Sequence, residues 1–191
     1  MIPALVEGHL DERVLRVLWR QIGRGDEELV IRDARGGSPF WTAAARYNEA
    51  GLRQPTIGLA DLEAETCATS ALQRLGRPRS AGFALRLAVR MVESWLIADR
   101  HAFAGYLGVA ASHIPAYPDQ LDHPKRTVIE LARTSRKRAV RDGLVPAGSA
   151  SVGPEYVPLM ARFVDEAWQV ERARTRSASL DRACARWAVH R

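Results

Sequence analysis

Short apolar runs alternate with amphipathic segments along the first hundred residues. Four such runs predict buried strands, at residues 3–6, 29–31, 55–60 and 83–89. After the first run, apolar residues recur at every fourth position from Leu10 to Ile22, which is the spacing of one helix face. Because helical segments with short connections separate the strands, we expect an α/β domain with a mainly parallel four-stranded sheet flanked by helices.

A glycine pair stands between the second strand and the next helix. Ser38 followed by Pro39 is typical of a helix start, so we expect Ser38 to cap a helix that ends near Gly51. The segment from Asp33 to Ser38 could hold an anion on its backbone amides, or it could be an ordinary turn from strand to helix. The sequence leaves both interpretations open.

The second half of the chain has the pattern of a helical region. Residues 91–98 are apolar on nearly every side, which predicts a buried helix. From Tyr156 onward apolar residues mark one face of an amphipathic helix, and a last helix is predicted over 180–187. We therefore expect an α/β domain over residues 1–110, and a helical, basic C-terminal extension over 111–191, packed on it as one compact unit.

The composition is that of a folded chain. Of the 191 residues, 47% are apolar and 26% are charged, which excludes an intrinsically disordered protein. The apolar stretches are far shorter than the ~20 residues of a membrane helix, and no apolar leader precedes the first strand, so we expect a cytoplasmic protein. Cys67 and Cys184 stand far apart, which argues against a disulfide framework or a zinc knuckle.

Positive charge is concentrated in the second half. The formal net charge is +6, and residues 1–100 carry 14 basic and 13 acidic groups, whereas 101–191 carry 14 and 9. Between residues 125 and 141, seven basic side chains accompany one acid, Glu130. Such a run is typical of a phosphate-binding surface, although a solvated helix face has the same composition. As nucleic-acid-binding residues we expect Arg126, Arg133, Arg136, Lys137, Arg138 and Arg141.

Acidic residues follow two of the predicted strands. Glu7 comes directly after the first strand, and Asp61 and Glu63 come after the third. In parallel sheets the carboxyl ends of the strands meet at one edge, where α/β proteins bind their ligands. If the chain stays extended through Leu62, Asp61 and Glu63 point to the same side. Carboxylates gathered there would suit Mg²⁺, although each acid alone could also be a turn former or a helix cap.

Glu93 is a further candidate. It is the one charged residue between Arg90 and Asp99, within a segment predicted to be buried. A buried carboxylate is costly unless it is paired or bound to a metal. An ion pair with Arg90 or Arg86 would account for Glu93 as well as a metal contact would.

These motifs resemble those of a known family. The sequence VEG at residues 6–8 resembles the first motif of topoisomerase-primase (Toprim) domains, and DLE at 61–63 resembles their later DxD motif. The segment VESWLIAD at 92–99, followed by Lys125, is similar to a segment of uncharacterised bacterial Toprim-like proteins related to the overcoming-lysogenization-defect (OLD) nucleases. The resemblance covers roughly residues 3–140.

The resemblance implies a nuclease that depends on Mg²⁺ or Mn²⁺ and cleaves phosphodiester bonds in DNA or RNA, with a role in defence against phage or plasmids. It implies that Asp61 and Glu63 are metal ligands and that Glu7 is either a metal ligand or the general base. Glu93 would be a further acid of the site. The family's second motif ends in aspartate, whereas Glu63 is longer by a methylene. The chain has no P-loop motif, so an ATPase of the kind that accompanies many OLD nucleases would be a separate partner.

Phosphodiester cleavage needs charge neutralised on a non-bridging oxygen and an activated water, both of which carboxylate-held metals provide. We therefore expect catalysis to depend on Glu7, Asp61 and Glu63, with Glu93 in support and Lys125 stabilising the developing phosphate charge. One alternative is a non-catalytic nucleic-acid- or partner-binding subunit with a degenerate Toprim site. Another is a phosphoryl-transfer enzyme that acts on small nucleotides.

Overall fold

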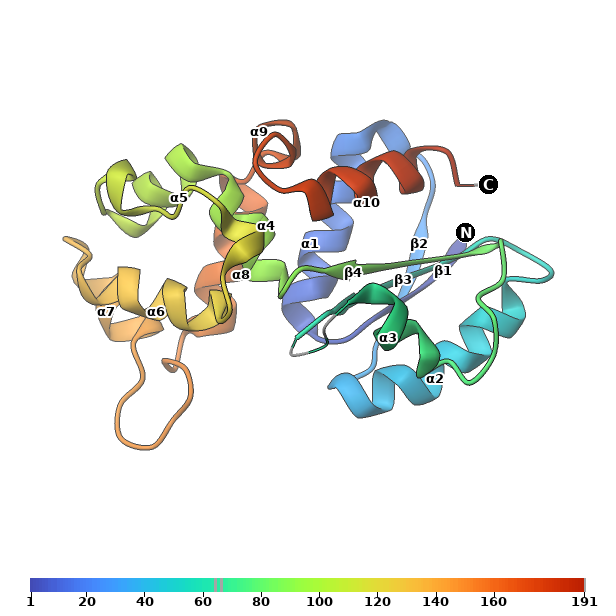
Figure 1. Ribbon diagram of the computed structural model, residues 1–191. Helices are drawn as coiled ribbons and strands as arrows, with labels where there is room; N and C mark the ends of the chain where they lie inside the picture. Colours follow the sequence, from blue (N-terminus) through green and yellow to red (C-terminus); the bar gives the residue numbers. More distant parts are fainter. Residues whose placement is uncertain (64, 66, 191) are drawn as a thin grey trace.

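A four-stranded parallel sheet forms the centre of the N-terminal half. The computed structural model describes residues 1–63, 65 and 67–190. The strands are β1 (Ile2–Val6), β2 (Leu29–Asp33), β3 (Thr56–Asp61) and β4 (Phe83–Ala88). They pair in parallel in the order β2-β1-β3-β4 (Figure 1). The predicted α/β class is confirmed, and every strand overlaps the apolar run that predicted it.

Helices cover both faces of the sheet (Figure 1). One face carries α1 (His9–Trp19), its continuation as the π-helix η1 (Arg20–Arg24), and α10 (Ala178–Ala188). The other face carries α2 (Gly37–Ala50) and α3 (Ala68–Gln73). Because strand side chains alternate in direction, Ala4 and Val6 belong to the first apolar core and Leu5 to the second. Both faces are buried, which explains why the strands are almost continuous apolar runs.

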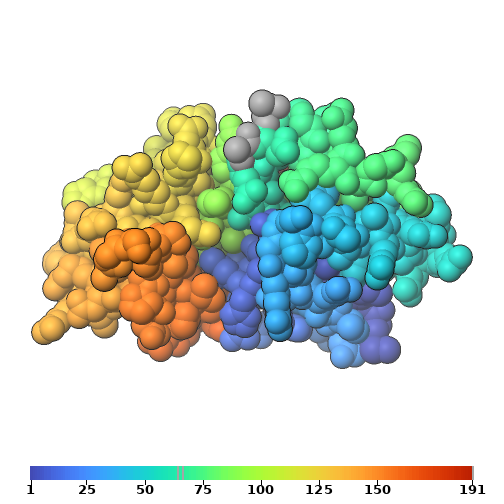
Figure 2. Space-filling model, turned by 90° about the horizontal axis from the view of Figure 1, so that it is seen from below, coloured from blue at the N-terminus to red at the C-terminus, as the bar shows by residue number. Residues whose placement is uncertain are grey.

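The remaining helices form a lobe beside the carboxyl edge of the sheet (Figure 1). They are α4 (Val92–Ala98), α5 (Arg100–Leu107), α6 (Pro124–Arg133), α7 (Arg138–Leu144), α8 (Tyr156–Glu166) and α9 (Val170–Arg174), with 3-10 turns η2 (Ala111–His113) and η3 (Pro118–Gln120). All seven residues of α4 are buried, as its apolar pattern predicts. Helix α8 packs against α1, and Figure 2 shows the orange segment of the lobe beside the blue N-terminal segments. The first apolar core therefore runs from the sheet into the lobe.

The last helix returns to the sheet. Trp187 Nε1 donates a hydrogen bond to the carbonyl of Ala84 in β4 (2.9 Å), and Ser179 Oγ accepts one from the amide of Val89 just after β4 (3.1 Å). These two contacts hold α10 along β4, which is an edge strand.

Within the described residues, no helix combines the length and apolar character needed to cross a membrane.

Helix α2 starts two residues earlier than predicted. Its N-cap is Gly36, at φ 126°, and its first residue is Gly37, so the prediction that Ser38 caps this helix was wrong. Residues other than glycine rarely adopt that backbone conformation. The amide of Gly36 also donates to the carbonyl of Glu7 (2.8 Å), which fixes the turn into α2 against the end of β1.

Candidate functional site

Acidic side chains gather in one pocket at the carboxyl edge of the sheet. Glu7 follows β1 and Asp61 ends β3, and these two strands are neighbours. Asp11 lies in the first turn of α1, and Glu93 lies in the first turn of α4, which follows β4. All four line a pocket of about 390 Å³. We call these four residues the acidic cluster.

Glu7 and Asp61 are linked directly. The amide of Asp61 donates to Oε2 of Glu7 at 3.3 Å. Gly37 stands on the other side of Glu7, so close that a Cβ at this position would lie 3.2 Å from Oε1. The second glycine of the pair between β2 and α2 thus makes room for the Glu7 carboxylate.

The two aspartates of the cluster are oriented by backbone amides. Oδ1 of Asp61 accepts from the amide of Val92 at the start of α4 (2.9 Å). Oδ2 of Asp11 accepts from the amide of Gly8 (2.7 Å), and Asp11 is 6% exposed. A backbone amide orients a carboxylate without supplying a full positive charge. Neither aspartate is therefore neutralised by its own hydrogen bond.

Glu93 is the most deeply buried acid of the cluster, at 2% exposure. Its Oε1 accepts from the hydroxyl of Tyr156 (3.1 Å) and lies 3.9 Å from Nζ of Lys125. The alternative that Glu93 pairs with Arg90 or Arg86 is not what the structure shows. Arg90 instead donates to the carbonyls of Glu63 and Glu65.

Burial and the repulsion of neighbouring carboxylates raise the pKa values of three members of the acidic cluster, Glu7, Asp11 and Asp61. Desolvation is the largest cause for Asp11 and Asp61, whose pKa values lie well above the ordinary 3.8, and neighbouring carboxylates raise them further. Burial also raises the pKa of Glu7, while the amide of Asp61 and the charge of Lys125 act in the opposite direction. The pocket thus holds more negative charge than its cations neutralise. Burial, and then the charge of Glu93, raises the pKa of Tyr156, which keeps its proton and donates it in the hydrogen bond.

Glu63 lies outside the pocket. Strand β3 ends at Asp61, and Glu63 has a φ of 50°, so the alternation of the strand does not continue to it. Asp61 and Glu63 therefore do not line the same pocket, although the sequence placed both in one site. The side chain of Glu63 is exposed, yet its charge raises the pKa of Glu7, which places it near the rim of the pocket.

A basic groove begins where the acidic pocket ends. Lys125 lines both the acidic pocket and a second pocket of about 480 Å³. We call the second pocket the basic groove; it is lined by Met91, His123, Lys125, Arg126, Ile129, Arg133, Pro146 and Ser151. Two predicted nucleic-acid-binding residues, Arg126 and Arg133, thus lie next to the acidic cluster. Arg126 is also paired with Glu130 on the surface of α6 (2.9 Å).

The rest of the predicted basic run has other contacts. Nζ of Lys137 donates to the carbonyls of Gly105 and Tyr106, both at 2.9 Å, and Arg141 donates to the carbonyl of Ser135. Arg138 is paired with Asp142 on α7 (3.1 Å), and Arg136 is exposed. Lys137 and Arg141 therefore hold α5 and α7 in place and do not line the groove.

Two residues of the site were not predicted, Asp11 and Tyr156. Asp11 stands four residues before Leu15 and seven before Leu18, on the buried stripe of α1, and an acid on such a stripe is the signal that would have found it. Tyr156 belongs to the apolar face of α8, where an aromatic residue is expected in any case. Its contact with Glu93 depends on how α8 docks, which no local pattern reveals.

The carboxylates of the pocket are oxygen donors of the kind that divalent cations prefer. Among the described residues, no group of three or more His, Cys, Asp or Glu side chains is arranged to hold a metal ion. Mg²⁺, however, keeps several waters and is commonly held by one or two carboxylates. The linked pair Glu7 and Asp61 offers such carboxylates, in a pocket whose excess negative charge a cation would offset. Carboxylates of this kind are the ligands that a largely hydrated Mg²⁺ or Mn²⁺ takes.

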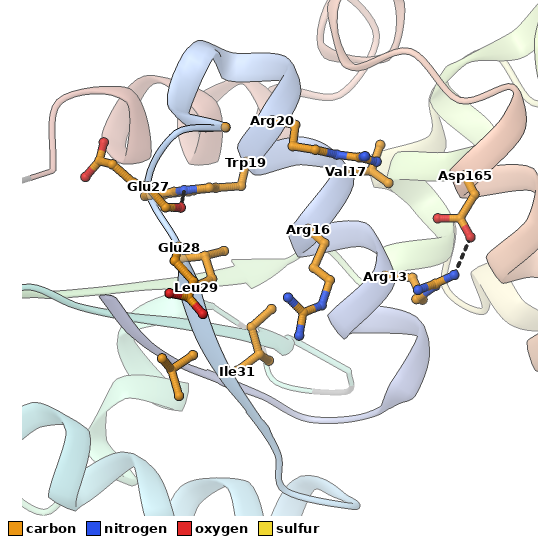
Figure 3. A pocket seen from close by; sticks show the side chains of 12 residues that line it. Arg13, Arg16, Val17, Trp19, Arg20, Glu27, Glu28, Leu29, Ile31 and Asp165 are labelled. Atoms are coloured by element: carbon orange, nitrogen blue, oxygen red, sulfur yellow. Dashed lines mark hydrogen bonds and ion pairs between the residues drawn. The ribbon is translucent and has the colours of Figure 1, made fainter. Parts of the chain in front are cut away.

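A larger pocket, of about 790 Å³, lies between α1 and the edge strand β2 (Figure 3). Its arginines have mixed surroundings: Arg13 is paired with Asp165 of α8 (2.6 Å) and Arg16 with Glu12 (2.8 Å). The residues of the acidic cluster do not line this pocket. Its size alone does not make it the site of chemistry.

No protein-family model, no curated protein and no solved structure matches the chain. The arrangement of the acidic cluster and the basic groove is therefore the basis for a functional assignment.

Proposed function

We propose that this chain is a metal-dependent nuclease that cleaves phosphodiester bonds and has a Toprim-like site. The observation that carries the proposal is the meeting of four acids from separate elements in one pocket, beside a lysine that also lines the basic groove. Acids of raised pKa in a cleft are common at catalytic sites, because catalysis needs groups whose protonation is finely balanced. Structural carboxylates are normally matched by cations.

The basic groove supplies the complementary half of a nucleic-acid site. Arg126 and Arg133 would hold the phosphates that flank the scissile bond, with Lys125 between them and the acidic cluster. A phosphodiester is an anion and would be repelled by the acidic cluster alone. The juxtaposition of a basic groove with an acidic pocket is therefore what cation-assisted cleavage requires.

Each residue of the site has a separate role in the proposed reaction. Glu7 and Asp61 would hold the cation, which when bound neutralises a non-bridging phosphate oxygen and lowers the pKa of a water. Oε1 of Glu7 accepts no hydrogen bond from the residues that the structure describes, and as an alternative role it would accept a proton from the attacking water. Lys125 would stabilise the charge that develops on the phosphate. Tyr156 fixes the rotamer of Glu93 through the hydrogen bond to Oε1.

Incubation of the protein with labelled DNA and RNA in the presence of Mg²⁺ or Mn²⁺ tests the proposal. We expect cleavage by the wild type and a loss of about 100-fold or more in Glu7→Gln and in Asp61→Asn, since each removes a group that acts on the cation or the water. Asp142→Asn, which removes an exposed acid of α7, is the matched control and should cleave normally. Equal activity in all four proteins would refute the assignment.

A second candidate is a non-catalytic subunit that binds nucleic acid with a degenerate site. The position of Glu63 favours it, because the acid that stands in the second family motif lies outside the pocket. Under this alternative the wild type binds DNA or RNA through the basic groove but cleaves neither with any metal. A separate ATPase partner and a role in defence against phage or plasmids, in the cytoplasm, belong to the nuclease proposal as its wider setting.

A further inference from the structure

Four arginines gather outside the acidic pocket, where α10 lies along β4. Arg79 precedes β4, Arg86 is part of it, and Arg182 and Arg186 stand four residues apart on α10. We call these four residues the arginine cluster.

The direction of Arg86 follows from the alternation of β4. Leu85 and Leu87 belong to the apolar core on the α2 side, whereas Ala84 and Ala88 belong to the core on the α10 side. Arg86 therefore leaves the sheet on the α10 side. Helix α10 is held there by the contacts of Ser179 and Trp187 with the β4 segment. Arg182 and Arg186 lie between these two residues along the helix.

The arginine cluster has no acidic counterpart. Throughout the described ranges, none of its four members forms an ion pair. Nε of Arg86 is buried and, among those same residues, has no hydrogen-bond partner. Burial lowers the pKa of Arg86, and the charges of Arg79, Arg186 and Arg182 lower it further. Like charges held together in this way cost free energy unless an anion joins them.

Protection of the edge strand does not account for the cluster. Arg79 donates to the carbonyl of Phe83 (2.6 Å) and Arg186 to that of Ala81 (2.8 Å), and such contacts cover an open sheet edge. They leave the buried Nε of Arg86 without an acceptor, and they do not explain why Arg182 stands on the same side. A ligand with several acceptor oxygens would offset the positive charge that Arg86 and Arg182 share with Arg79 and Arg186, by contacting the accessible parts of the cluster.

We propose that the arginine cluster binds a phosphate group, either of a nucleic-acid backbone or of a free polyphosphate. The planar guanidinium presents paired donors that match phosphate oxygens, and phosphate carries the negative charge that the cluster lacks. The site is separate from the acidic pocket and does not depend on the chain being a nuclease.

Binding of a fluorescent DNA duplex, followed by anisotropy in buffer with EDTA, tests the proposal without any cleavage. In Arg182→Gln/Arg186→Gln we expect binding about tenfold weaker, because two charge-assisted contacts are lost. The slope of log affinity against log salt concentration should fall by about two. Arg16→Gln/Arg20→Gln is the matched control, since it also removes two arginines four residues apart on a helix surface and should change binding little (Figure 3).

Inorganic tripolyphosphate provides the second arm. It should raise the Tm of the wild type above that in chloride of equal ionic strength, and the shift should vanish in Arg182→Gln/Arg186→Gln. A loss of DNA binding together with a loss of this shift indicates a site that accepts free polyphosphate as well. A loss of DNA binding with no tripolyphosphate shift in any protein indicates the nucleic-acid backbone as the source.

Arg86→Met replaces the half-buried guanidinium by a shorter, uncharged side chain and serves as an independent variant. It should weaken phosphate binding as the α10 variant does, and it should not lower the Tm in phosphate-free buffer, since it relieves repulsion. The proposal is overturned if both variants bind DNA and tripolyphosphate like the wild type. It is also overturned if the Arg16/Arg20 control loses as much affinity, because net charge alone would then explain the result.

Discussion

Two buried carboxylate sites in this chain are built in opposite ways. Asp99, at 1% exposure, receives Nε (2.9 Å) and Nη2 (2.7 Å) of Arg172 together with the amide of Gln169 (2.9 Å). The aspartates of the acidic cluster receive single backbone amides and face other carboxylates. The first site is a closed ion pair that joins α4 and α9. The second keeps its charge available, which a binding site needs and a structural contact does not.

Removal of Asp99 should have the largest effect on stability. Asp99→Ala leaves the donors of Arg172 and Gln169 without their acceptor, and we expect a loss of about 1–3 kcal/mol in the free energy of unfolding, measured with urea. The control Asp142→Ala breaks an exposed pair with Arg138 and should cost less than about 1 kcal/mol. Equal losses would mean that the Asp99 contact is no stronger than a surface ion pair.

The same change of aspartate to asparagine should have opposite signs at the two sites. Without metal, Asp11→Asn keeps an acceptor for the amide of Gly8 and removes a repelling charge, so it should stabilise the fold by about 1 kcal/mol or more. For a chain of this length that corresponds to about 2–4 °C in Tm. Asp99→Asn should lower the Tm. A lower Tm in both variants would show that Asp11 is stabilised as a charged group.

The pH dependence of stability gives a further comparison. The folded-state pKa values of Asp11 and Asp61 lie above the ordinary 3.8, so the folded chain binds these protons more tightly than the unfolded chain. Their contribution to stability is complete below 3.8 and is lost as the pH rises through the raised pKa values. The advantage of Asp11→Asn over the wild type should therefore grow as urea unfolding is repeated from acid toward neutral pH. An advantage that stays constant or shrinks would contradict the raised pKa values.

The sequence predicted the framework better than the details of the site. The four strands follow from apolar runs that remain visible because both sheet faces are buried. Glu7 and Asp61 were found because the carboxyl ends of parallel strands must meet at one edge. Glu63 was assigned to the pocket in error, because its positive φ ends the alternation of side-chain directions along β3. A glutamate gives no sequence signal for that conformation. The arginine cluster was missed because it exists only once α10 has returned to β4.

Substitution of Glu63 should have much less effect than substitution of Glu7. Its effect on the free energy of unfolding should be the smallest of all these variants. Glu63 is exposed, so Glu63→Gln should change the free energy of unfolding by less than about 0.5 kcal/mol. It should also keep most of the cleavage activity that Glu7→Gln loses. Parallel cleavage assays of the two variants check this. An equal loss of cleavage would indicate that Glu63 is also a cation ligand.

Calorimetric titration of Mn²⁺ tests the central claim most directly, namely that the acidic cluster keeps its charge for a divalent cation. The wild type and Asp142→Asn should give the same saturable binding curve, and Asp61→Asn should give none. Absence of binding in the wild type, or an unchanged curve in Asp61→Asn, would contradict the account.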